Sequence, residues 1–433
     1  MVNDLNLRLE MAVSGDSVII NIEGLAHSIE EMMSPDSLVL PKSCIFKIPN
    51  ILYRQNEKAF IPDAFSFGPL HHDGNPNLKA VEKIKLQYLQ CLISRLHTSE
   101  IGKKMVIDLI KAIKEVEKEA RQYYAESIEY TPEEFVKILL IDGCFIIELF
   151  RKDAYEELRE KDDPIFTMSC MLQLLYHDLI LLENQVPWIV LERLFNMTKQ
   201  QTHTESLLQL AIQFFGTTFS ATPPTKILPL NDIKHIVDLL RKWLVSSIKE
   251  EENNSEYWEV MPSATGLVEA GIKFVKATSE SILDVKFNDG VLEIPPLLIQ
   301  ETTETAFRNL IAFEQCYTDC EAWLTSYALL IDNLINTTKD VDILCESKII
   351  HSWSNRKEVV QFFNKLYHNT YVKTFYYGRL CNNVNGYCNS RWPRWLAVLV
   401  RNYFNTPWAL LSTLAAIILL ILSFLQTLYT IKC

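Results

Sequence analysis

Three runs of the chain place charged and amide side chains inside strongly apolar stretches. They are Asp142–Glu148, Asp178–Gln185 and Arg308–Gln315. Carboxylates at such positions are suited to general acid–base catalysis or to metal binding. One hypothesis is therefore an enzyme that uses the acids of these runs, namely Asp142, Glu148, Asp178, Glu183 and Glu314.

The same runs have a structural interpretation, which we favour. A buried carboxylate needs partners in any fold, so we expect Arg308 to pair with acids from residues 142–148 or 178–185. Asn184 and Gln185 would then tie helix ends together through their amides. The three runs contain no histidine, which weakens the catalytic interpretation.

Standard catalytic signatures do not occur in the sequence. Glycine-rich phosphate loops, the dinucleotide-binding glycine motif, His-Glu-x-x-His and Gly-x-Ser-x-Gly are all missing. His71 and His72 stand before Asp73 and Gly74, a pattern typical of a turn, and adjacent histidines rarely bind one metal ion. We therefore expect no catalytic residue, no metal site and no cofactor, and a protein that is not an enzyme.

The last part of the chain predicts a membrane helix. No charged residue occurs from 402 to 431, and residues 408–431 are almost wholly apolar. A helix of about 24 residues spans about 36 Å, enough to cross a bilayer. Aromatic residues flank this stretch, as they do at membrane interfaces. A buried core helix is the alternative, but core helices rarely run so long without a charge.

Charges around this stretch predict its orientation. Lys432 alone follows it, whereas three arginines precede it, at Arg391, Arg394 and Arg401. Positive charge favours the cytosolic side, so we expect a cytosolic body on the plasma membrane, inserted after synthesis. The first residues carry acids and lack the apolar core of a signal peptide, which agrees with this orientation.

Two features favour the alternative, an extracellular body. Cys381 and Cys388 bracket a polar stretch that a disulfide could close into a loop. Glycosylation triplets begin at Asn196, Asn253 and Asn336.

Composition and charge limit the classes of partner. The chain has 433 residues, 48% of them hydrophobic and 22% charged, which is a globular composition. Its net charge of −12 opposes nucleic-acid binding, which depends on neutralising phosphates. We expect a bilayer and other proteins as partners, and no nucleic acid.

Periodicity predicts a mainly α fold. We divide the chain into a loosely ordered lead-in (1–40), one helical domain (41–378), a basic aromatic juxtamembrane segment (379–407) and a transmembrane helix (408–431). Residues 41–76 are rich in proline and aromatic residues and should form packed irregular chain.

Local signals predict individual elements. Thr131-Pro-Glu-Glu134 predicts a capping box that opens a helix through Phe150. An Asp-Gly turn between alternating apolar residues predicts a small β-hairpin at about 282–295. Further helices are expected at 168–183, 187–195, 204–215, 231–249, 302–316, 318–336 and 356–378.

The polar runs and several other motifs resemble a plant family called "domain of unknown function 247". Asp142–Phe150 and Asp178–Pro187 are similar to its motifs almost letter for letter. Four residues differ from those usual at the corresponding motif positions of the family, namely Ala64, Phe65, Ala80 and Val81. The other matching stretches are Ile45–Pro49, Ala64–His72, Leu78–Tyr88, Ala264–Phe274, Phe307–Gln315 and Tyr403–Trp408.

The resemblance implies little chemistry. Members of this family are land-plant proteins with a C-terminal membrane anchor and no established enzymatic activity, and some grass members are associated with self-incompatibility. We therefore expect a membrane-anchored interaction, signalling or recognition protein whose protein partners are unknown. The alternative is an unrecognised enzyme that uses the buried carboxylates.

Overall fold

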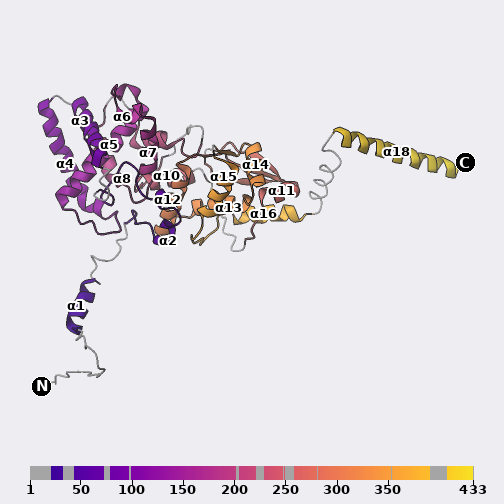
Figure 1. Cartoon of the computed structure of the whole chain (residues 1–433), viewed down its shortest axis with the longest axis horizontal. Helices are drawn as coiled ribbons and strands as arrows, with labels where there is room; N and C mark the ends of the chain where they lie inside the picture. Colours follow the sequence, from indigo (N-terminus) through magenta and orange to yellow (C-terminus); the bar gives the residue numbers. More distant parts are fainter. Residues whose placement is uncertain are drawn as a thin grey trace, which may run out of the picture. The chain divides into compact units, whose positions relative to one another are not determined.

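Helices make up most of the described chain, which confirms the mainly α fold class (Figure 1). Two units are distinguished, Met1–Lys42 and Ser43–Cys433, and the first contains helix α1 (Ile22–Met32). The structure is a computed structural model, and it describes residues 21–32, 43–72, 79–96, 99–200, 204–220, 229–246, 248, 258–279, 281–352, 354–390 and 407–432.

Helix α5 (Pro132–Ala154) is the centre of the first half of the body. It opens with the predicted capping box, in which Thr131 and Glu134 each accept a hydrogen bond from the other's backbone N–H. The helix continues four residues beyond the predicted Phe150. It is largely buried because it packs against α3 (Lys79–Leu96), α4 (Ser99–Arg121), α8 (Trp188–Met197) and α9 (Leu207–Phe215).

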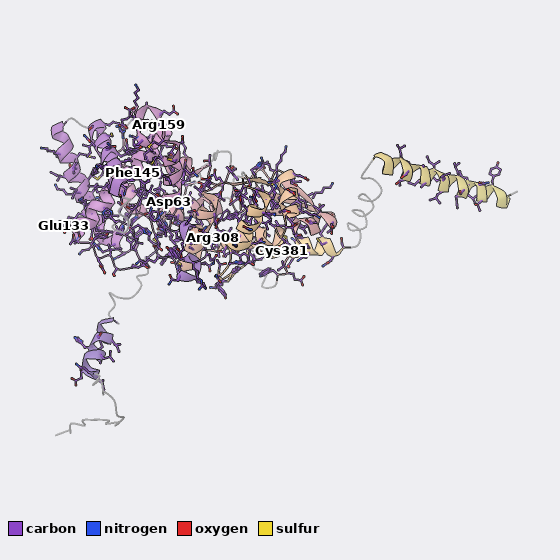
Figure 2. All side chains as sticks on the ribbon, in the orientation of Figure 1. Asp63, Glu133, Phe145, Arg159, Arg308 and Cys381 are labelled. Atoms are coloured by element: carbon purple, nitrogen blue, oxygen red, sulfur yellow. The ribbon has the colours of Figure 1, made fainter. Side chains whose placement is uncertain are left out.

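Shorter helices build the rest of the body, and side chains fill the space between them (Figure 2). These helices are α2 (Asn50–Tyr53), α6 (Pro164–Thr167), α7 (Ser169–Leu179), α10 (Ile236–Ser246), α11 (Ala264–Glu269), α12 (Thr303–Cys316), α13 (Trp323–Leu334), α14 (Thr338–Glu346), α15 (Arg356–Leu366) and α16 (Gly378–Asn389), with 3-10 turns at Glu57–Ala59 and Glu156–Leu158. Helix α12 is central in the second half of the body, where it packs against α10, α13 and α15.

The predicted hairpin is present as β2 (Lys286–Asn288) and β3 (Val291–Ile294), paired antiparallel. Asp289 and Gly290 both have positive φ, as a two-residue hairpin turn requires. A Cβ at Gly290 would lie 2.4 Å from the Tyr387 hydroxyl, so this position needs glycine.

The sheet contains more than the sequence predicted. Strand β1 (Lys273–Lys276) pairs parallel with β3 and completes the order β1-β3-β2. A second pair joins β4 (Leu297–Ile299) to β5 (Ile350–Ser352), also parallel. Such pairings join residues distant in sequence, which local patterns do not reveal.

Several predicted helices end early. Helix α7 ends at Leu179 instead of 183, and the predicted helix 356–378 ends as α15 at Leu366. Asn369 has a φ of 59°, a left-handed conformation that no helix can continue through.

The start of the predicted juxtamembrane segment belongs to the folded body. Helix α16 covers its first residues and packs against β2. Cys381, Val384 and Cys388 line its buried side (Cys381 is labelled in Figure 2). Spacing of three or four residues places these apolar side chains on one face, which explains why the body extends past residue 378.

Helix α18 (Pro407–Lys432) contains the apolar stretch Leu411–Tyr429. In the described part of the chain it is the one helix long and apolar enough to cross a membrane, by length and composition, and none of that stretch is buried. Arg391, Arg394 and Arg401 lie outside the described residues.

Candidate functional site

Asp178, the first acid of the second polar run, ends up fully buried at the C-terminus of α7. Its Oδ1 accepts a hydrogen bond from the backbone N–H of Asp63 at 2.8 Å. Its Oδ2 accepts from Ala64 at 2.9 Å and from Phe65 at 2.6 Å. These three N–H groups lie in residues 43–72, where the chain is mostly irregular, as predicted. One carboxylate therefore satisfies three consecutive backbone donors.

Asn184, in the turn after α7, binds the next part of the same segment. Its Oδ1 accepts from the backbone N–H of Phe67 at 2.7 Å. Its Nδ2 donates to the carbonyls of Phe65 and Asp178, both at 2.8 Å. The amide thus holds both the irregular segment and the end of α7.

Gln185 closes the same turn and connects it to α10. Its Nε2 donates to the carbonyls of Leu179 at 2.7 Å and Leu181 at 2.8 Å. Its Oε1 accepts from the backbone N–H of Ile236 at 3.0 Å, at the first residue of α10. The two amides therefore tie helix ends together, as the sequence analysis proposed.

Asp142, on α5, makes a third attachment to the irregular segment. Its Oδ2 accepts from the backbone N–H of Gly68 at 2.9 Å, and its Oδ1 pairs with Lys85 Nζ at 2.7 Å. Lys85 is fully buried and also donates to the Ser66 carbonyl. Burial lowers the pKa of Lys85, but the charges of Asp142 and Glu82 outweigh it and raise that pKa above its ordinary value.

Gly68 is required where the segment passes this pair. Its φ is 69°, and an added Cβ would lie 2.4 Å from the Gln185 carbonyl oxygen. The backbone approaches too closely for any side chain, and the left-handed conformation also favours glycine.

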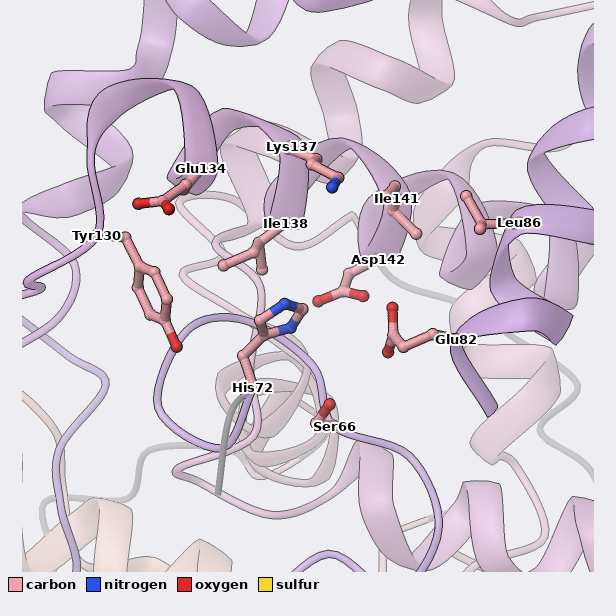
Figure 3. Close-up of a pocket in the computed structure, with 10 residues that line it drawn as sticks. All are labelled: Ser66, His72, Glu82, Leu86, Tyr130, Glu134, Lys137, Ile138, Ile141 and Asp142. Atoms are coloured by element: carbon pink, nitrogen blue, oxygen red, sulfur yellow. The ribbon is translucent and has the colours of Figure 1, made fainter. Parts of the chain in front are cut away.

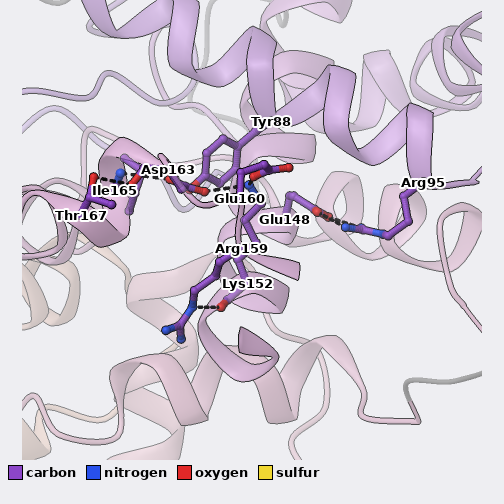
Figure 4. A network of polar contacts seen from close by, with 9 residues as sticks. All are labelled: Tyr88, Arg95, Glu148, Lys152, Arg159, Glu160, Asp163, Ile165 and Thr167. Carbon is purple, nitrogen blue, oxygen red and sulfur yellow. Dashed lines mark hydrogen bonds and ion pairs between the residues drawn. The ribbon is translucent and has the colours of Figure 1, made fainter. Parts of the chain in front are cut away.

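Glu148 lies six residues further along α5 and is fully buried. The guanidinium of Arg95, on α3, donates two hydrogen bonds to its carboxylate, of which the one from Nη2 to Oε2 is 2.6 Å long. Beside this pair, Lys152 binds Asp163 at 2.8 Å and the Tyr88 hydroxyl donates to the same carboxylate at 2.8 Å (Figure 4). This network joins α3, α5 and the chain that leads into α6.

Glu183 and Glu314 also accept backbone donors. Glu183 accepts from the N–H of Ile48 at 2.6 Å. Glu314 accepts from Leu324 at 3.0 Å and Thr325 at 2.9 Å, in the first turn of α13. Burial raises the pKa of Glu314, although Arg241 and these N–H groups oppose the rise.

Arg308 does not pair with the acids that we predicted. Its Nε binds Glu304 at 2.7 Å and its Nη1 binds Gln55 at 3.1 Å. Its neighbour Asn309 instead reaches the second run and accepts from the Leu182 N–H at 2.8 Å. Successive side chains on a helix point about 100° apart, so only one of the two can face that run.

A cavity of about 480 Å³ lies between α3, α5 and the turn at His72 (Figure 3). Asp142 reaches its wall, but both oxygens of that carboxylate already hold hydrogen bonds to Lys85 and Gly68. The lining residues are Ser66, His72, Glu82, Leu86, Tyr130, Glu134, Lys137, Ile138, Ile141 and Asp142.

One group of side chains has the composition of a metal site. Ligand atoms of Asp63, His177 and Asp178 lie within 4.8 Å of one another. However, His177 Nδ1 is 2.9 Å from Asp178 Oδ1 and its Nε2 is 3.3 Å from the Lys58 carbonyl. With the three backbone donors on Asp178, these contacts occupy the ligand atoms of His177 and Asp178. The group fits a hydrogen-bonded cluster better than a metal centre.

The sequence analysis did not name several residues that contact the three polar runs, among them Lys85, His177 and Asn309. Lys85 occupied an apolar position of its helical pattern, which was the available signal that it is buried. His177 directly precedes the second run, and Asn309 directly follows Arg308. No local pattern showed which of two adjacent polar residues faces the interior.

Comparison with known proteins places these motifs in a family context. The family model described as "Plant protein of unknown function" matches residues 45–422. A UPF0481 protein of Arabidopsis thaliana is 28% identical, over 92% of this chain and 88% of its own length. A putative UPF0481 protein of the same plant is 22% identical, over 94% and 93% respectively. No solved structure matches.

Replacing Asp178 with asparagine should destabilise the body. The substitution puts an amide NH₂ where backbone N–H groups need an acceptor, at a cost of about 3 kcal/mol in the free energy of unfolding. Chemical denaturation of D178N measures this cost. The control D162N changes an exposed aspartate nearby and should stay within about 0.5 kcal/mol of the parent. Equal stability of the two variants would contradict the assigned role.

His177 should make stability depend on pH. Burial lowers its pKa, but the hydrogen bond and charge of Asp178 and the charge of Asp63 outweigh burial and raise that pKa above 6.5. The stabilisation is therefore complete below the unfolded value and is lost as pH rises through the folded one. Between about pH 6 and about pH 8 the parent should lose more stability than H177Q.

The exposed His351 supplies the control for this titration. H351Q should keep the parent's profile of unfolding free energy against pH. If H177Q and the parent have parallel profiles, the imidazolium of His177 contributes nothing to the fold.

Proposed function

We propose that this chain, which belongs to the plant family of unknown function whose model covers residues 45–422, is a binding protein and catalyses no reaction. In this proposal it is a membrane-anchored protein whose helical body binds other proteins. The observation that carries the proposal is the state of the acidic residues. All five acids that could have served an enzyme are engaged in holding the fold.

The acids argue against the enzymatic alternative through their geometry. A general base needs an oxygen that faces a substrate, and a metal ligand needs a free lone pair. Asp178 uses its oxygens for three backbone N–H groups, and Glu148 uses both of its oxygens for Arg95. Asp142 reaches a cavity, yet Lys85 and Gly68 occupy its oxygens. The hydrogen bonds of these three acids account for their presence in the interior without a catalytic role.

Helix α18 supports the anchor. Its stretch Leu411–Tyr429 has 19 residues, within the range of about 17 to 25 that crosses a hydrocarbon core at about 1.5 Å per residue, and it contains no charge. The exposed fractions of Leu420 and Phe424 are 70% and 65%, so the helix finds no apolar cover in the described structure. A bilayer would provide that cover.

We propose that the membrane is the plasma membrane and that the body faces the cytosol, and the cysteines support this orientation of the body. Cys381 and Cys388 lie on the same helix, seven residues apart. Seven residues of helix rise about 10 Å, beyond the separation that a disulfide bridges. The disulfide loop that favoured an extracellular body is therefore not formed. Arginines at 391, 394 and 401 supply the positive charge expected on the cytosolic side.

Deleting residues 402–433 should release the protein from membranes. The deletion removes the apolar helix, and the remaining acidic body has no other described helix of that kind. After a carbonate wash, the parent should remain in the pellet and the deletion variant should appear in the supernatant. A variant lacking residues 2–20 is the control and should pellet like the parent. A deletion variant that stays in the pellet would refute the anchor.

Protease digestion of sealed, cytosol-side-out vesicles tests the orientation. The body should be digested, and the triplets at Asn196, Asn253 and Asn336 should carry no glycan. Asn196 and Asn336 are exposed, so the fold would not block their modification. Protection of the body together with an endoglycosidase-sensitive mass would place it on the outside and reverse our assignment.

A further inference from the structure

The solvent-facing side of α4 concentrates positive charge. Its exposed positions recur at the three- and four-residue spacing that keeps side chains on one face of a helix. The lysines of this side, which we call the lysine face, are Lys103, Lys104, Lys111, Lys114 and Lys118. The chain as a whole has a net charge of −12, so this face is opposite in sign to the chain's net charge.

Nearby acids leave most of this charge uncompensated. Glu115 pairs with Arg193 of α8, and Asp108 lies 4.0 Å from Lys111. The other four lysines of the face form no ion pair within the described chain. Their charge is therefore available to a binding partner.

The lysine face has an apolar centre. Ile107 and Ile110 lie one turn apart among the lysines, and their exposed fractions are 52% and 41%. Apolar side chains that a ring of charge surrounds are typical of protein-binding surfaces, where the apolar centre supplies affinity and the charged rim supplies specificity.

The opposite side of α4 fixes the face rigidly. Leu109, Ile113 and Ala120 are fully buried, and the helix packs against α5 and α8. The two exposed isoleucines take no part in this packing. They can contact a partner without any change in the body.

The chemistry of the lysine face bears on the kind of partner. Its lysines attract carboxylates, and the exposed Ile107 and Ile110 favour a partner that also presents apolar side chains. An acidic surface with an apolar stripe meets both requirements, whereas lipid headgroups meet the first alone.

We propose that the lysine face binds an acidic amphipathic helix of a partner protein. The partner's apolar stripe would cover Ile107 and Ile110, and its carboxylates would pair with the lysines on either side. The face extends from Lys103 to Lys118, about 22 Å along the helix, which matches a partner helix of about 15 residues. This inference deepens the proposed interaction function and rests on it.

The test uses the full chain in nanodiscs of neutral lipid. The probe is a labelled synthetic helical peptide of about 15 residues with a leucine stripe between glutamates. A second peptide has lysine in place of every glutamate. Fluorescence anisotropy should show that the acidic peptide binds, that the basic one does not, and that added salt weakens binding.

Two matched variants locate the site. K103E/K104E/K114E/K118E should weaken binding of the acidic peptide by about tenfold or more, because four surface ion pairs become repulsive. K273E/K276E/K339E/K357E makes the same charge change at exposed lysines elsewhere and should bind like the parent. I107S/I110S should also weaken binding, which distinguishes an apolar centre from attraction by charge alone.

Two results would overturn the inference. They are failure of the acidic peptide to bind and equal loss of binding in both charge-reversal variants. If the peptide fails and phosphatidylserine vesicles bind through these lysines, the face is a lipid site instead. If charge reversal unfolds the body, the neutral set K103Q/K104Q/K114Q/K118Q answers the same question. A failed peptide test leaves the anchor and the orientation to be judged by their own experiments, so the two failures remain distinguishable.

Discussion

The fold depends on the attachment of an irregular, buried segment to helices through side-chain acceptors. Residues 63–68 enter the interior, where 65–68 are buried, without a helix or sheet to satisfy their backbone N–H groups. Asp178, Asn184 and Asp142 supply the missing acceptors, to five N–H groups in all. A buried N–H without a partner costs about 1–3 kcal/mol, so these contacts decide whether the segment can pack at all.

This arrangement explains why carboxylates occur inside apolar runs of the sequence. A carboxylate is the acceptor best suited to several converging donors, because two oxygens offer about four lone pairs and the negative charge strengthens each bond. Asp178 holds three consecutive N–H groups in this way. The requirement for Asp178 and Asp142 thus comes from the irregular segment.

The sequence predicted what local chemistry determines. The capping box of Thr131 and Glu134 and the Asp289-Gly290 hairpin turn are short-range patterns, and both are present. The turn after α7 was also interpreted correctly, because amides that follow a helix commonly close its end.

Contacts between distant segments could not be predicted. The partner of Arg308 depended on a rotation of about 100° along α12, which decides whether residue 308 or 309 faces the second run. Strand β1 joins its sheet by a parallel pairing across 18 residues, from Lys273 to Val291. The predicted helix 356–378 could not continue through Asn369, whose backbone is left-handed, and no local pattern predicted that conformation.

Hydrogen exchange at the backbone amides of residues 63–65, 67 and 68 tests the central claim most directly. Regular structure protects none of these amides, so their protection depends on the acceptors in Asp178, Asn184 and Asp142. We predict exchange as slow as that of the buried middle of α5, because release requires the body to unfold. Exchange at the rate of exposed loop amides would show that the segment opens independently and would contradict the account.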